Sequence, residues 1–191
     1  SVRFELVARC PHTGARRGRL HTPHGTVDTP AFMPVGTQGS VKTLGSEDLE
    51  AMRYGLLLAN TYHLALRPGE ELVRRQGGLH RFMSWPGALL TDSGGYQVMS
   101  LSSIREITDD GVAFKSHLDG SALHMTPERS IQIQAALGVD VSMAFDECPP
   151  YPCTRDVAQQ AMERTHRWAA RCLEARTEGQ AVFGIVQGGV H

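Results

Sequence analysis

The sequence predicts an α/β protein of the (β/α)8-barrel (TIM-barrel) type, with about five of the eight strand–helix units present. Short apolar runs alternate with helical patterns, which is typical of a parallel sheet. Each apolar run ends in a polar or glycine-rich cluster, and in a barrel those ends meet on the face that carries the chemistry. An open doubly wound sheet is the alternative, but its usual glycine-rich phosphate loop is missing. The five clusters are Gly36-Thr37, Asn60, Asp92, Asp146 and Gln187.

Composition is typical of one globular domain. The 191 residues are 41% hydrophobic and 20% charged, with a net charge of −1, so there is no general basic signature for nucleic-acid binding. We find no signal peptide and no apolar run of about 18 residues, and we therefore expect a cytoplasmic protein without a membrane span. The four cysteines show no CxxC spacing, so we expect reduced thiols and no metal site.

Residues 1–29 predict a small antiparallel β unit. Residues 2–8 alternate between apolar and polar side chains, as a half-buried strand does. The turn Pro23-His24-Gly25 then joins two further strands. We interpret His21 and His24 as parts of this hairpin rather than as metal ligands.

Residues 30–191 predict the barrel units of a single domain. Helices are expected from Ser46 to Gly55, from Pro68 to Gly77, over 126–138 and over 154–176, where capping residues and charges mark the ends. A hairpin insertion at about 102–125 follows the third strand, because Asp110-Gly111 and Asp119-Gly120 are strong turn signals. The predicted strands are 30–35, 56–59, 88–91, 140–145 and 181–186, and the inner stripe of the last helix is Val157, Ala161, Thr165, Trp168 and Cys172.

The stretch Thr91–Leu101 carries the strongest functional signal. Asp92 follows a buried apolar strand, and the next glycines allow a flat ligand to approach the backbone. Asp92 and Asp146 would share one rim, where paired carboxylates suit general acid–base catalysis or cleavage of a glycosidic bond. A strand followed by an ordinary Asp-Ser-Gly turn is the structural alternative.

Asp146 and Gln187 have the chemistry to recognise a guanine-like edge. A carboxylate pairs with two adjacent N–H donors, which guanine offers at N1 and its 2-amino group, while an amide donates to O6. Tyr96 could stack on the base, a contact worth roughly 1–3 kcal/mol. Capping by Asp146 and backbone bonding by Gln187 remain open, as does a barrel enzyme with another substrate.

Several motifs together carry a resemblance to a known family. The chain resembles the N-terminal half of bacterial tRNA-guanine transglycosylase, also called queuine tRNA-ribosyltransferase. This resemblance implies a (β/α)8 barrel that exchanges guanine at the first anticodon position of GUN-anticodon tRNAs for 7-aminomethyl-7-deazaguanine, through a covalent aspartyl intermediate in queuosine biosynthesis. The matching segments are 29–37, 59–64, 91–101, 125–128, 145–148 and 183–189.

The resemblance also implies roles for individual residues. Asp92 would be the general acid/base, and Cys148 would lie near the base without reacting. The implied substrate-binding residues are Asp92, Ser93, Gly94, Gly95, Tyr96, Asp146 and Gln187.

In the family, the nucleophilic aspartate and the ligands of a structural zinc lie further along the chain. We therefore expect this chain to supply the base pocket without a nucleophile, a zinc site or another cofactor of its own. The implied partners are tRNA, guanine and 7-aminomethyl-7-deazaguanine, together with a second copy of the chain or a C-terminal half. The alternatives are a non-catalytic or split-enzyme subunit and a carboxylate-pair glycoside hydrolase.

Overall fold

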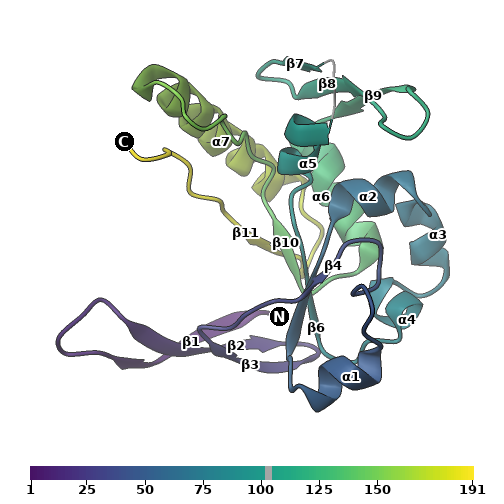
Figure 1. Cartoon of the computed structure of the whole chain (residues 1–191), viewed down its shortest axis with the longest axis vertical. Coiled ribbons are helices and arrows are strands. Elements are labelled where there is room, and N and C mark those ends of the chain that lie inside the picture. Colours follow the sequence, from purple (N-terminus) through teal and green to yellow (C-terminus); the bar gives the residue numbers. More distant parts are fainter. Residues whose placement is uncertain (102–104) are drawn as a thin grey trace.

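A parallel sheet lies at the centre of the fold (Figure 1). The computed structural model describes residues 1–101 and 105–191. Within these residues the sheet has five strands in the order β11-β10-β6-β5-β4, and all neighbouring strands are parallel. The described part of the chain is thus a mixed α/β fold with an open sheet, and it does not close into a barrel. The strands are β4 (Val35–Gly36), β5 (Leu56–Ala59), β6 (Ala88–Thr91), β10 (Val141–Met143) and β11 (Ala181–Phe183).

Helices connect the strands of this sheet. The prediction over 126–138 is confirmed, because the Thr126 hydroxyl accepts a hydrogen bond from the Arg129 N–H at 3.1 Å and Gly138 ends the helix with a φ of 70°. The helix over 154–176 is also confirmed, and its N-cap is Thr154. The helices are α1 (Ser46–Ala51), α2 (Thr61–Leu66), α3 (Glu70–Arg75), α4 (Leu79–Met83), α5 (Gly95–Leu101), α6 (Pro127–Leu137) and α7 (Arg155–Ala175).

Several details of the predicted elements are wrong, and the strands expected over 140–145 and 181–186 cover only Val141–Met143 and Ala181–Phe183. The first barrel strand covers only Val35–Gly36 instead of 30–35, because Pro30 and Pro34 have no N–H to donate to a sheet. The second helix begins at Glu70, not at Pro68. The buried stripe of α7 begins with Ala158 instead of Val157, which is 42% exposed.

The core lies on both faces of the sheet. Leu57 and Leu89 point toward the helices and belong to one buried cluster with Ile131 and Trp168. The alternate residues of the same strands, among them Leu56, Ala88 and Leu90, form a second cluster. A strand buried on both faces is a continuous apolar run, which explains why β5 and β6 were readable from the sequence.

The N-terminal unit is an antiparallel sheet of β1 (Arg3–Arg9), β2 (Arg16–Thr22) and β3 (Gly25–Thr29). Leu20 and Val27 attach it to the parallel sheet by packing in the second cluster. The expectation of a half-buried first strand is wrong, since Phe4 is 49% and Leu6 41% exposed. Among the described strands, β1 is an outer strand that pairs with β2 alone, and its register shifts between Leu6 and Ala8, which breaks the alternation.

The predicted insertion forms an antiparallel meander of β7 (Arg105–Ile107), β8 (Val112–Lys115) and β9 (Ala122–Met125). Its predicted start, residues 102–104, lies outside the described residues. The meander and the N-terminal sheet lie at opposite ends of the molecule (Figure 1). Among the described residues, no helix has the length and apolar character needed to cross a membrane.

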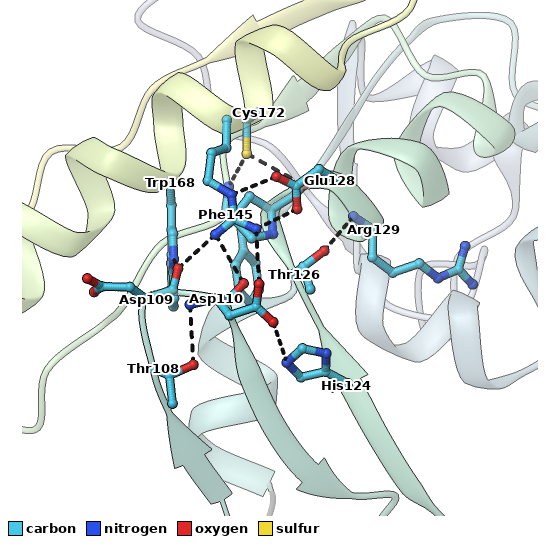
Figure 2. Close-up of polar contacts among 12 residues, drawn as sticks. Thr108, Asp109, Asp110, His124, Thr126, Glu128, Arg129, Phe145, Trp168 and Cys172 are labelled. Atoms are coloured by element: carbon cyan, nitrogen blue, oxygen red, sulfur yellow. Dashed lines mark hydrogen bonds and ion pairs between the residues drawn. The ribbon is translucent and has the colours of Figure 1, made fainter.

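A polar network fastens the meander to α7 (Figure 2). Trp168 Nε1 donates to the backbone oxygen of Asp109 at 2.8 Å, and its fully buried ring stacks on Phe145 with centroids 4.9 Å apart. Arg171 donates to the same Asp109 oxygen at 2.7 Å. It also donates two hydrogen bonds, of 2.6 and 2.7 Å, to the Glu128 carboxylate. The loop before β8 is therefore held by side chains of the longest helix.

Candidate functional site at the carboxyl ends of the strands

Asp92 lies at the carboxyl end of β6, beside the end of β5. The parallel register pairs Ala59 with Thr91, so the residues that follow these strands are neighbours. One Asp92 oxygen accepts a hydrogen bond from the Asn60 side-chain amide, and the other accepts from the Thr61 N–H at 2.8 Å. The Thr61 hydroxyl donates to the Asp92 backbone oxygen at 2.6 Å. The carboxylate is thus fixed in orientation by the neighbouring strand end.

The surroundings of Asp92 favour its neutral form. Burial raises the pKa of this carboxyl, although hydrogen bonds from Asn60, Thr61, Gln97 and Gly94 oppose the increase. A carboxyl with a raised pKa exchanges protons nearer neutral pH than an ordinary aspartate does. This behaviour suits a general acid/base, the role that the sequence predicts for Asp92.

Asp146 lies at the carboxyl end of β10 and joins residues from both adjacent strands. Ser93, after β6, donates its hydroxyl to Asp146 Oδ1 at 2.6 Å, and Gln187, after β11, donates its amide to Oδ2 at 2.7 Å. Burial raises the pKa of Asp146, which is 6% exposed, while these two hydrogen bonds counteract the increase. Each carboxylate oxygen has two lone pairs, so both can accept one further donor.

Two glycines shape the backbone beside these carboxylates. A Cβ on Gly95 would lie 2.5 Å from the Asp146 backbone oxygen and 3.0 Å from Oδ1, so a side chain there would force the Asp146 backbone to shift and would crowd its carboxylate. Gly94 has a φ of 80°, a conformation that residues with a Cβ rarely adopt, and lies against Tyr62. The Asp-Ser-Gly-Gly turn is thus required by close packing at this rim.

Tyr96 and Gln97 are on α5, a short helix that sequence reasoning missed. The Tyr96 side chain is 62% exposed and is not in stacking contact with any described ring. Gln97 donates to Asp92, and its Oε1 is a buried oxygen without a hydrogen-bond partner among the described residues. Asn60, Thr61 and Gln97 are the site residues that the sequence did not assign, although Asn60 was recognisable as a strand end.

Cys148 lies two residues beyond Asp146. Burial and the negative charge of Asp146 raise the pKa of its thiol, so the thiol stays protonated at neutral pH. Cys148 and Gln187 line a hollow of about 230 Å³ with the loop Pro149–Cys153. This loop borders the rim on the β10 side.

A second group of polar side chains lies at the other end of the sheet. His24, His80 and Asp140 bring one ligand-type atom each within 4.8 Å of one another. The hairpin at Pro23-His24 is confirmed, but no local sequence pattern predicts this cluster, since its members are 60 and 116 residues from Asp140.

The sheet and its row of polar strand ends define an α/β protein with two carboxylates, Asp92 and Asp146, at the carboxyl ends of adjacent parallel strands. A family model described as queuine tRNA-ribosyltransferase matches residues 10–191, and the chain belongs to that family. The resemblance inferred from the motifs is confirmed.

Named relatives agree with this assignment. The queuine tRNA-ribosyltransferase of Bacillus cytotoxicus is 58% identical over 191 residues, which cover 99% of this chain and 50% of the relative. Those of Bacillus mycoides and Bacillus cereus are 57% identical over the same shares. The chain spans about half the length of the curated relatives it matches.

Proposed function

We propose that this chain forms the base pocket of a tRNA-guanine transglycosylase. The exchange would replace guanine at the first anticodon position of GUN-anticodon tRNAs with 7-aminomethyl-7-deazaguanine. The observation that carries the proposal is the Asp146 carboxylate, held between Ser93 and Gln187 on the same rim of the sheet as Asp92. The family and the relatives' name support the same reaction class.

The unused hydrogen-bond donors and acceptors of this rim match the edge of guanine. Asp146 would accept hydrogen bonds from N1–H and the 2-amino group with its remaining lone pairs. Gln187 uses one amide hydrogen for Asp146 and would give the other to O6. Tyr96, exposed at the start of α5, would cover the base face, with Ser93, Gly94 and Gly95 beneath it.

Asp92 would exchange a proton with the ring nitrogen of the departing or arriving base. Its raised pKa makes both protonation states accessible, and Asn60 and Thr61 fix its direction. The unpartnered Gln97 Oε1 lies beside Asp92 and would accept a donor of the bound base. Cys148 would border the pocket as an unreactive thiol.

The remaining parts of the activity would come from outside these residues. The relatives are about twice as long, so we infer that a following segment or a C-terminal half supplies the nucleophilic aspartate, the structural zinc and the strands that complete a (β/α)8 barrel. A second copy of the chain is the other partner to consider. Because tRNA is the substrate, the reaction would take place in the cytoplasm.

A carboxylate-pair glycoside hydrolase is the second candidate. Both Asp146 oxygens accept protein hydrogen bonds, which suits a fixed acceptor for N–H groups better than a nucleophile or a base that activates water. A non-catalytic subunit is the third candidate, and it would not require a raised pKa at Asp92.

The test is exchange of labelled guanine into unmodified tRNA with a GUN anticodon, alongside equilibrium binding of guanine to the chain. The chain would be assayed alone and with the family segment that follows residue 191 in its relatives. We expect guanine binding by the chain and exchange only in the mixture, with exchange lost in Asp92→Asn and retained in Asp156→Asn, an exposed control.

Exchange by the chain alone would place a nucleophile within residues 1–191. It would refute the proposal that a separate segment supplies the nucleophile. Guanine binding without exchange in any mixture would favour the non-catalytic subunit. Hydrolysis of glycosides without guanine binding would favour the hydrolase.

A further inference from the structure

Two histidines and a buried aspartate meet at the amino-terminal end of the parallel sheet. His24 lies in the turn between β2 and β3, His80 is on α4, and Asp140 directly precedes β10. His24 Nδ1 is 2.8 Å from Asp140 Oδ1, and His80 Nε2 is 3.0 Å from Asp140 Oδ2. Asp146 follows the same strand at its other end, so this cluster is separate from the base pocket.

We propose that His24, His80 and Asp140 bind one divalent transition-metal ion of the Zn²⁺ class. Imidazole nitrogens with one carboxylate are a donor set that suits Zn²⁺ and disfavours Mg²⁺, which prefers oxygen ligands. Two donors that share a tetrahedral ion through bonds of 2.0–2.1 Å lie about 3.3 Å apart. The two nitrogens lie against different oxygens of the Asp140 carboxylate, and the three ligand-type atoms lie within 4.8 Å of one another, so they need to draw together around one ion.

The carboxylate is already oriented for this task. Its side chain is 1% exposed, and the Leu89 N–H donates to Oδ2 at 2.8 Å, which fixes the carboxylate plane from the adjacent strand β6. Hydrogen bonds of this kind hold metal-binding carboxylates in position and are part of the metal site itself.

The histidines supply one fixed and one adjustable ligand. His80 is 13% exposed on α4, whereas the His24 side chain is 39% exposed at its turn. Their rings are stacked with centroids 3.6 Å apart, so a shared ion requires one ring to rotate, and the exposed His24 has the room. The same exposure leaves a side open for a water molecule as fourth ligand.

An ion at this position would join three separate elements. It would connect the β2–β3 hairpin to α4 and to the start of β10, in addition to the apolar contacts of Leu20 and Val27. The ion would therefore act on the attachment of the N-terminal sheet, and the inference does not depend on the reaction at the opposite rim.

The experiment is a titration of the chelator-treated 191-residue chain with Zn²⁺. Binding is measured by calorimetry and by competition with a chromophoric chelator. We expect one ion per chain, a raised melting temperature and, with Co²⁺, a visible absorption spectrum, whereas Mg²⁺ gives none of these. His24→Ala and His80→Ala should each weaken binding by more than roughly 100-fold, because losing an outer hydrogen-bond partner alone costs 10- to 100-fold. His124→Ala, an exposed histidine of the meander, is the matched control and should bind normally.

A second readout needs no variant. In the wild-type chain, bound Zn²⁺ should protect His24 from acylation by diethyl pyrocarbonate and leave His124 reactive, as mapped by mass spectrometry. No saturable binding of Zn²⁺ to the folded wild-type chain, unchanged affinity in His24→Ala, or equal labelling of His24 with and without Zn²⁺ would each overturn the proposal. The cluster would then be a hydrogen-bonded His–Asp–His contact only.

Discussion

Replacing Asp146 by asparagine changes the charge at the centre of the proposed base edge and almost nothing else. The side chain keeps its shape, and Ser93 and Gln187 still find partners, because an amide retains one oxygen and Gln187 can turn its own amide. What is lost is the second acceptor, because one N–H donor of guanine would meet the new NH2 group. A turned Gln187 amide would also direct its oxygen, instead of an N–H, toward O6.

The expected cost follows from that exchange of partners. A hydrogen bond to a charged group contributes about 1.5–3 kcal/mol. Losing one such bond and opposing two donors should weaken guanine binding by about 3 kcal/mol, or roughly 100-fold. The same substitution should not lower the stability of the fold. Burial raises the pKa of Asp146, so its neutral form stabilises the fold, and this contribution is lost as the pH rises through that raised pKa.

Calorimetric guanine binding from pH 4 to pH 8, with thermal unfolding of the same samples, tests both expectations. In the wild-type chain affinity should be full above the raised pKa of Asp146 and should fall as the pH is lowered through it; in Asp146→Asn affinity should be weak throughout, and the melting temperature at pH 7 should not fall. Asp156→Asn, on the exposed start of α7, is the control. Equal affinity in Asp146→Asn and wild type would refute the assignment of Asp146 to the base edge.

Three further substitutions test the packing around the site. Trp168→Phe removes an indole hydrogen bond in a filled core and should lower the free energy of unfolding by about 2 kcal/mol in a urea titration; an unchanged midpoint would contradict the contact. Gly95→Ala should cost about 1–3 kcal/mol and impair guanine binding, whereas Gly14→Ala, with open space around it, should be neutral; equal effects would argue against the close approach. Arg171→Ala should destabilise by about 1–3 kcal/mol through lost bonds to a carboxylate and two carbonyls, while the exposed Arg176→Ala should not, as melting temperatures would show.

The elements that the sequence predicted well have residues at their ends that mark where they begin and stop. β5 and β6 contain short apolar runs and are followed by Asn60 and Asp92, and the structure reproduces both predicted ranges. α6 is bounded by Thr126 and Gly138, whose cap geometries act within a few residues. Such local signals need no knowledge of the tertiary structure.

The elements that it missed depend on contacts made elsewhere in the chain. α2, α4 and α5 have 6, 5 and 7 residues, which is too short for a helical period to show. The stretch that contains Asp92 was interpreted as a turn only, although its second part is α5. The burial of β1 was wrong for a related reason, since alternation shows two faces but not whether anything covers them.

The candidate site was predictable in part for the same reason. The alternation of strands and helices predicts parallel strands, so Asp92 and Asp146 are expected on one rim, and the structure brings Ser93, Asp146 and Gln187 into hydrogen-bond contact. Their roles toward a base stay predictions. The bond from Asn60 to Asp92 and the meeting of His24 with Asp140 depend on three-dimensional placement that no local spacing encodes.

The hydrogen bonds that run from Asn60 through Asp92, and from Ser93 through Asp146 to Gln187, follow the order β5, β6, β10, β11. Adjacent strands lie about 4.8 Å apart, so the strand spacing of the sheet sets the spacing of the groups that we propose for base recognition. A flat ligand that reaches across one or two strand spacings meets groups from neighbouring strands and none from the core beneath. Under the proposed function, a substitution at one strand end would alter the contact with one part of the base, while the apolar core that fixes the strand spacing stays the same.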